Sequence, residues 1–159
     1  MTLERDIELL KSVPFFDGIP AEPLKLIAFS ADSREIEDGR FLFSAGDAAE
    51  GGFVLVEGRI DLVDEGPTPP KVLERLGPGA LIGELALIVE TKRPATALAV
   101  GRARVLAVRR SLFRRMLGEY AEIAVTLRDR IADRLGALAP EIGRIRDVME
   151  GGERRGEGS

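Results

Sequence analysis

The segment 83–96, GELALIVETKRPAT, sets the carboxylate of Glu84 and the guanidinium of Arg93 nine positions apart among mostly apolar or small residues. Glu84-Leu-Ala-Leu-Ile favours a single helical turn, whose first N–H groups can receive an anion. Arg93 carries a planar fork of donors that matches the paired oxygens of a phosphate. A ligand with a phosphate bound to Arg93 and a hydroxyl group bound to Glu84 would be a phosphorylated sugar. An internal Glu84–Arg93 ion pair would satisfy the same side chains, and the residues alone leave both interpretations open.

The composition excludes most catalytic chemistry. The chain has no Cys and no His, which removes disulfides, thiolate or imidazole zinc sites, and nucleophiles activated by His. The carboxylates form no pair with a plausible task. We therefore expect no enzyme activity, no catalytic residue, no metal site and no cofactor.

Charge and hydropathy bear on partners and location. Residues 1–100 carry 18 acids and 10 bases, an excess of eight acids, whereas residues 101–159 carry an excess of four bases. Such an acidic body does not suggest nucleic-acid binding, so no DNA partner is expected. No apolar run approaches the ~18 residues of a membrane span. The first residues lack a basic region and cleavage site, so we expect a cytoplasmic protein without membrane contact.

The predicted secondary structure around this segment divides the chain into three regions: helices, then strands, then helices. Two helices are expected at 3–10 and 21–31. From residue 33 to 109, short strands alternate with glycine turns, which predicts an antiparallel barrel or sandwich, with a hairpin at Glu57-Gly58. A helix should follow, with Ser111 as its N-cap. Its continuation carries an apolar stripe from Ala124 to Met149, and Pro140 should kink or end it.

The central segment resembles the phosphate-binding cassette of the cyclic nucleotide-binding domain family. That cassette reads roughly G-E-L-A-L, with R-x-A-T beginning nine residues after the Glu, and GELALIVETKRPATALA matches it without a gap. The flanks FLFSAGD, FVLVEGRIDLV and LGPGALIGE resemble the turns of the family, and SLFRRML resembles its first helix after the roll. The resemblance covers roughly residues 8–118. It implies a mainly β fold, an eight-stranded, jelly-roll-like antiparallel β-roll with helices at both ends, as in catabolite activators and kinase regulatory subunits.

The resemblance also implies roles for individual residues. Arg93 would pair with the cyclic phosphate, and Glu84 would accept the ribose 2′-hydroxyl. A helix residue typically caps the base. The implied ligand-binding residues are Gly83, Glu84, Leu85, Ala86, Leu87, Arg93, Pro94, Ala95 and Thr96, with Leu127 or Ile131 as the base cap.

Pro94 departs from the family pattern, which more often has Ala, Ser or Thr after the arginine. Proline has no N–H for the phosphate. A donor lost to a charged acceptor costs on the order of 1.5–3 kcal/mol, unless the Ala95 amide takes its place. Pro94 also offers no hydroxyl, and a hydroxyl there accompanies guanine preference in parts of the family. We therefore favour cAMP over cGMP.

The expected organisation is a nucleotide-binding roll at 1–118, a C-terminal helix at 119–150 and a disordered tail at 151–159. The length leaves no room for the winged helix-turn-helix of gene regulators of this family, so a stand-alone sensor in signal transduction is expected. Its stripe at 120–149 either covers its own roll or contacts a second copy or a protein partner. The alternative function is an interaction or structural module on the same fold whose degenerate pocket binds no nucleotide.

Overall fold

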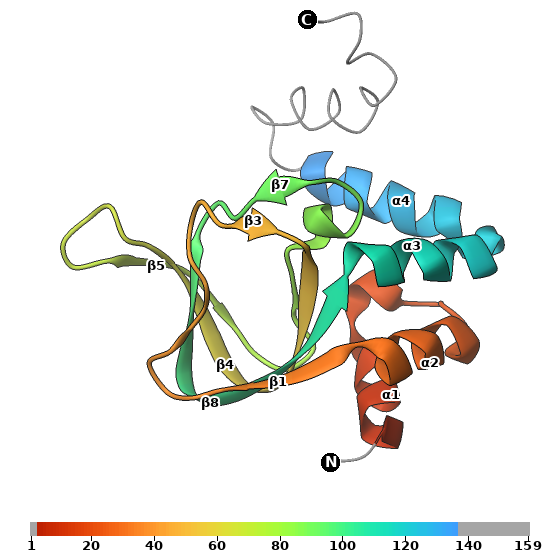
Figure 1. The fold of residues 1–159 in the computed structure, drawn as a ribbon, viewed down its shortest axis with the longest axis horizontal. Coiled ribbons are helices and arrows are strands. Elements are labelled where there is room, and N and C mark those ends of the chain that lie inside the picture. The colour runs from red at the N-terminus through yellow and green to blue at the C-terminus, as the bar shows by residue number, and fades with distance from the viewer. Residues whose placement is uncertain (1–2, 137–159) are drawn as a thin grey trace, which may run out of the picture.

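The computed structural model describes residues 3–136, in which strands enclose one side of the molecule and the helices gather on the other (Figure 1). The helices are α1 (Leu3–Ser12), α2 (Ala21–Ser30), α3 (Arg110–Glu119) and α4 (Ala121–Gly136), with 3-10 turns η1 (Pro14–Phe16) and η2 (Glu84–Leu87). The strands are β1 (Asp32–Ile36), β2 (Phe41–Phe43), β3 (Ala48–Ala49), β4 (Gly51–Asp64), β5 (Lys71–Leu76), β6 (Leu81–Ile82), β7 (Thr91–Lys92) and β8 (Thr96–Arg109). The antiparallel pairing and flanking helices confirm the predicted β-roll class.

Two long strands form the frame of the roll. β4 and β8 pair along their length, from Gly51 opposite Arg109 to Val63 opposite Thr96. The hairpin predicted at Glu57-Gly58 is wrong, because β4 runs through this point with a shift of register. Gly58 has φ +87°, and a Cβ there would collide with the backbone of β8. Its glycine therefore permits a bulge that bends the paired strands, instead of a turn that reverses the chain.

The two faces of β4 belong to different apolar clusters. Val54 and Val56 pack with the helices, whereas Phe53 and Leu55 face a cluster built from strand residues. This alternation is the period of two that a strand with both faces covered must show. The inward positions of β8 are mostly small: Ala97, Ala99, Ala103 and Ala107. Small side chains leave the interior of the roll room that leucine or isoleucine would fill.

The helices confirm the expected order, with one correction. α3 begins at Arg110, and its N-cap is Arg109, which makes no side-chain cap bond, so the prediction of Ser111 as the N-cap is wrong. Three stripe residues of α4, Ala124, Leu127 and Ile131, are buried in the cluster of the helices, beside α3 and η1. Pro140, the stripe beyond α4 and the predicted tail lie outside the described residues. No helix between residues 3 and 136 has the length and apolarity that crossing a membrane requires.

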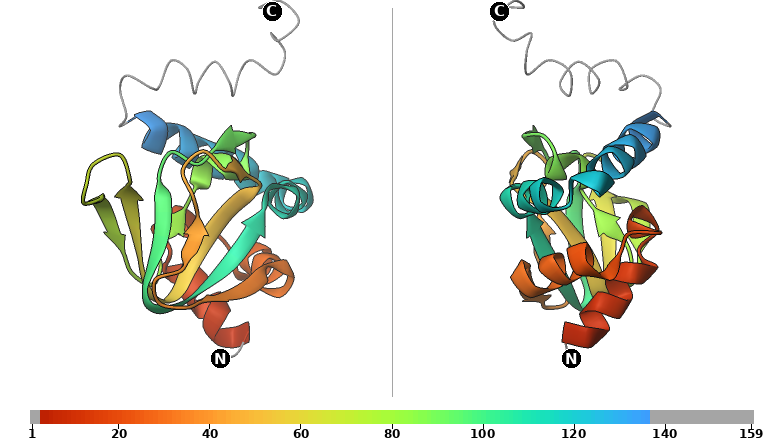
Figure 2. Two further views of the ribbon diagram at one scale, coloured as in Figure 1. Left: turned by 60° about the vertical axis from the view of Figure 1, so that its left-hand side comes forward. Right: turned by 90° about the vertical axis from the view of Figure 1, so that its right-hand side faces the viewer.

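A buried ion pair joins α1 to the roll. The right-hand view of Figure 2 shows α1 lying across the roll. Arg104 of β8 donates to the Asp6 carboxylate at 2.7 Å and to the Ser33 hydroxyl at 3.0 Å. The Asp6 and Arg104 side chains are only 14% and 8% exposed. The pair joins positions 98 apart in sequence, so it fixes the N-terminal helix on the outside of the frame.

Candidate functional site

The site begins at Gly83, which joins β6 to η2. Its φ of +78° and ψ of 42° lie in the left-handed region, which glycine enters without the strain that a Cβ causes. The turn that follows is the predicted helical turn, shortened to a 3-10 turn over Glu84–Leu87. Within it, the Ala86 amide donates to the Gly83 carbonyl at 3.1 Å. The Leu87 side chain is fully buried under the turn, and Leu85 packs partly buried on the same cluster, so these side chains anchor the cassette to the helices.

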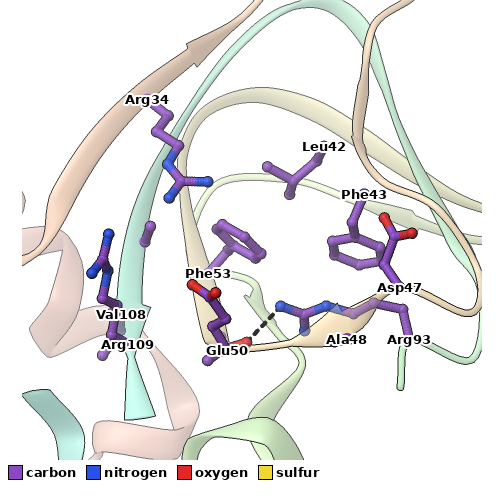
Figure 3. A pocket seen from close by; sticks show the side chains of 13 residues that line it. Arg34, Leu42, Phe43, Asp47, Ala48, Glu50, Phe53, Arg93, Val108 and Arg109 are labelled. Atoms are coloured by element: carbon purple, nitrogen blue, oxygen red, sulfur yellow. Dashed lines mark hydrogen bonds between the residues drawn. The ribbon is translucent and has the colours of Figure 1, made fainter. Parts of the chain in front are cut away.

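Arg93 lies at the other end of the cassette, between β7 and β8, and is only 7% exposed. One guanidinium nitrogen donates to the Gly51 carbonyl at 2.7 Å (Figure 3). The guanidinium carbon lies 4.5 Å from the ring centre of Phe43 and 5.2 Å from that of Phe53. In residues 3–136 no ion pair joins Arg93 to Glu84 or to another carboxylate. The internal Glu84–Arg93 pair considered from sequence is thus not the arrangement found.

The surroundings of Arg93 disfavour the charged form of its guanidinium. Burial lowers the pKa of its guanidinium from the ordinary value, and the positive charge of Arg110 lowers this pKa further. The Asp47 carboxylate opposes both effects. A buried cation with weak compensation favours the arrival of an anion, because desolvated charges require a partner.

The backbone of Arg93 is fixed by the turn between β2 and β3. Its N–H donates to the Asp47 carbonyl at 2.8 Å, and its carbonyl accepts from the Gly46 amide at 2.8 Å. The Asp47 carboxylate in turn accepts from the Ser44 amide at 2.9 Å, which closes that turn. Both peptide groups that flank the arginine Cα are therefore held by the segment 44–47.

The remaining residues of the predicted cassette differ in their surroundings. Pro94 is exposed, and Ala95 is buried beside it. Thr96 is fully buried, and its hydroxyl accepts from the Ala45 amide at 2.9 Å and donates to the Glu65 carboxylate at 2.5 Å. Its hydroxyl thus already joins two loops of the roll, whereas the predicted contact with a ligand stays a prediction.

Residues of the cassette line two separate cavities. The first, of about 200 Å3, has Arg93, Phe43 and Phe53 in its wall (Figure 3). The second, of about 270 Å3, has Gly83 and the half-buried Glu84 in its wall. A Cβ on Gly83 would overlap the Arg93 guanidinium, so the arginine of the first cavity lies against the backbone of a residue that lines the second. The structure thus brings Gly83 and Arg93 together and places Glu84 in the wall of the second cavity.

The proposed base cap lies elsewhere. Leu127 and Ile131 are fully buried on α4, in the cluster of the helices, and neither side chain lines either cavity. Capping by these residues stays a prediction, and it would require α4 to move away from its own cluster.

Sequence reasoning missed several residues that the fold supplies. Gly51, Phe43 and Phe53 approach Arg93 from β2 and β4. Arg110 donates to the Ala86 carbonyl at 3.0 Å and to the Ala49 carbonyl at 2.5 Å. Because the sequence predicts that the helix begins after Ser111, it gives no signal for Arg110, and only the fold shows that this residue reaches the cassette and β3.

The chain is similar to known proteins in sequence and in fold. The family model described as "Cyclic nucleotide-binding domain" matches residues 33–120. A cyclic nucleotide-gated potassium channel of Mesorhizobium japonicum is 29% identical over 135 residues, which are 85% of this chain and 36% of the channel. The chain therefore spans about a third of that relative.

Two solved structures resemble the fold. The structure of a cyclic nucleotide-binding-like protein from Brucella abortus has 38% identity and a TM-score of 0.65, over 71% of this chain and 97% of that one. The regulatory domain of Toxoplasma gondii PKA, crystallised with cAMP, has 26% identity and a TM-score of 0.71, over 85% of this chain and 50% of that one.

Proposed function

The chain belongs to the cyclic nucleotide-binding domain family, and from this premise we propose that it binds a cyclic nucleotide, cAMP in preference to cGMP, in the cytoplasm. The proposal includes a regulatory role: occupancy of the site is relayed through α3 and α4 to a protein partner or a second copy. Relatives supply regulatory contexts for such a domain, including the PKA regulatory domain crystallised with cAMP.

The proposal rests on one observation, the burial of the Arg93 guanidinium without an ion-paired carboxylate among residues 3–136. Its guanidinium is buried, without an ion-paired carboxylate in the described part of the chain, at the position where the family motif has its phosphate partner. A buried cation that, among the described residues, only the Asp47 carboxylate offsets is costly, and a phosphodiester anion provides further negative charge and a paired set of acceptors. Glu84, in the wall of the second cavity, is then the acceptor for the ribose 2′-hydroxyl.

The preference for cAMP rests on Pro94. A hydroxyl at this position accompanies guanine recognition in parts of the family, and proline has none. Pro94 also lacks the N–H that would donate to the phosphate, so we expect binding weaker than that of members with an amide donor there.

The relay begins at Arg110. This residue opens α3 and donates to the carbonyl of Ala86 in the cassette and to that of Ala49 in β3. A ligand that moved η2 would therefore pull on the first turn of α3, where Leu112 and Phe113 could repack. At α4, Arg130 donates to the Phe15 carbonyl at 2.8 Å, which links that helix to η1. The proposed contact with a partner lies at residues 120–149, of which only those up to 136 are described.

Calorimetry with cAMP and cGMP tests the proposal. We expect saturable binding that is tighter for cAMP, and a loss of ~2–5 kcal/mol in binding free energy for Arg93→Gln. Arg102→Gln is the matched control, because Arg102 is an exposed arginine paired with Glu35, away from both cavities of the cassette. An absence of heat and of thermal shift at millimolar nucleotide would reject the proposal and favour the interaction module with a degenerate pocket.

A further inference from the structure

The guanidinium of Arg93 is held by aromatic rings in place of carboxylates. Its carbon atom lies 4.5 Å from the ring centre of Phe43 and 5.2 Å from that of Phe53. The rings themselves are stacked, with centres 5.9 Å apart and planes inclined by 27°. Both distances are within the ~6 Å over which a cation is attracted to the face of an aromatic ring.

This choice of neighbours has an electrostatic consequence. A carboxylate in contact would neutralise the arginine and compete with any incoming anion. The quadrupole of a ring attracts the cation without adding a formal negative charge. The Gly51 carbonyl fixes one guanidinium nitrogen in the same neutral manner. The charge of Arg93 thus remains available while its position is fixed.

Phe43 and Phe53 lie on different strands, β2 and β4, which both pair with β8. Phe43 lies on β2, opposite Ala97 of β8, and Phe53 lies on β4, opposite Ala107 of β8. In both pairs the small alanine opposite leaves space on the inner face of the roll. Phe53 is only 7% exposed, so its ring has little freedom to leave the arginine.

We propose that Phe43 and Phe53 are positioning residues that preorganise Arg93 for a singly charged phosphodiester anion. This inference rests on the proposed function for the identity of the ligand, and it adds two residues outside the cassette that act through the arginine. Fixing a long side chain before binding removes an ordering cost that the ligand would otherwise have to offset. The rings therefore contribute to affinity without contacting the ligand.

Affinity measurements on matched variants test the proposal. Phe43→Leu should weaken cAMP binding roughly 5- to 30-fold, since it removes one ring face from a desolvated guanidinium. Phe43→Tyr keeps the ring and should retain affinity within about twofold. Phe41→Leu is the matched control, because Phe41 lies on the same strand, is 55% exposed and does not line the cavity of the arginine. Equal losses for Phe41→Leu and Phe43→Leu would overturn the proposal.

A double-mutant cycle separates positioning from a general structural effect. In an Arg93→Gln background, Phe43→Leu should change the remaining affinity by no more than about twofold, because the ring then has no cation to hold. A full additive loss in that background would mean that Phe43 supports the roll in some other way, and would refute the assignment.

An NMR measurement on the ligand-free, unsubstituted protein does not depend on nucleotide binding. The side-chain Nε–H signal of Arg93, identified by its absence in Arg93→Lys, should be displaced by the ring currents of Phe43 and Phe53. It should return towards the ordinary arginine position in Phe43→Leu and stay unchanged in Phe41→Leu. An ordinary position in the unsubstituted protein would overturn the inference. If this signal is displaced and no cyclic nucleotide binds, the positioning stands and the proposed function fails.

Discussion

The guanidinium of Arg93 fills the space that a side chain at residue 83 would need. A Cβ built on Gly83 would lie closer to Nη1 of Arg93 than real Cβ contacts ever come. The same glycine has a φ of +78°, so backbone conformation and close approach both require it. The first residue of the cassette thus fixes where its arginine can lie.

Gly83→Ala should therefore weaken nucleotide binding by an order of magnitude or more, because the added methyl group displaces the guanidinium. It should also lower the free energy of unfolding by about 1–2 kcal/mol, the cost of a left-handed alanine. Gly39→Ala is a close control, since Gly39 also has φ +78° but has nothing within 4 Å of its Cβ position. Calorimetry and denaturant unfolding on both variants check this. A loss of binding that is equal in the two variants would show that the clash with Arg93 is irrelevant.

Pro94→Ala should strengthen the binding of cAMP by roughly ten- to a hundredfold, since it restores an N–H donor near the phosphate. Pro94 is exposed, so the substitution removes little packing. Titration calorimetry measures the change. An unaltered dissociation constant would mean that another amide, such as that of Ala95, already serves the phosphate.

Asp6→Ala should lower the free energy of unfolding by roughly 3 kcal/mol, because it leaves Arg104 buried without its carboxylate. Among residues 3–136 the Nε atom of Arg104 is already buried without a hydrogen-bond partner, and the neutral Ser33 hydroxyl cannot replace the negative charge of the carboxylate. Glu4→Ala, at an exposed position on the same helix, should change the unfolding free energy by no more than about 0.5 kcal/mol. Chemical denaturation of both variants decides the matter, and a similar small effect in each would show that α1 is held mainly by apolar packing.

Arg110→Gln should uncouple α3 from the cassette while retaining most of the affinity for nucleotide. The substitution removes the donors to Ala86 and Ala49, and it also removes a positive charge that lowers the pKa of Arg93. The chain has no cysteine, so spin labels can be placed on cysteines introduced at exposed Lys71 and Glu119.

The label-to-label distance should change with cAMP in the parent protein and change much less in Arg110→Gln. Arg114→Gln, at an exposed position of α3, provides the comparison and should respond like the parent. A full response in Arg110→Gln would exclude this route for the relay.

The cassette could be predicted from sequence because its signal is local. Glu84 and Arg93 lie within one short segment, and the glycine before them has a left-handed conformation that glycine adopts without strain. The rings around Arg93 could not be predicted in this way. Phe43 and Phe53 are separated from it by 50 and 40 positions, and only the pairing of β2 and β4 with β8 brings them to the arginine.

The wrong hairpin shows a second limit. Glu57-Gly58 has the residues of a turn, and a glycine with positive φ is present there. A bulge in a continuous strand and a turn that reverses the chain can both require a residue with positive φ. What distinguishes them is the partner strand, because β8 follows β4 past this point with its backbone against Gly58. The identity of that neighbour is a property of the fold and not of the dipeptide.

The double attachment of the Arg93 backbone to residues 46 and 47 limits how the domain can be re-engineered. A graft of segment 83–96 into another roll would transfer the arginine without the turn that supports its peptide groups. The smallest transplantable unit thus comprises two stretches of chain, 43–53 and 83–96, and a chimera that mixes them from different parents should lose the geometry of the guanidinium even when each stretch is intact.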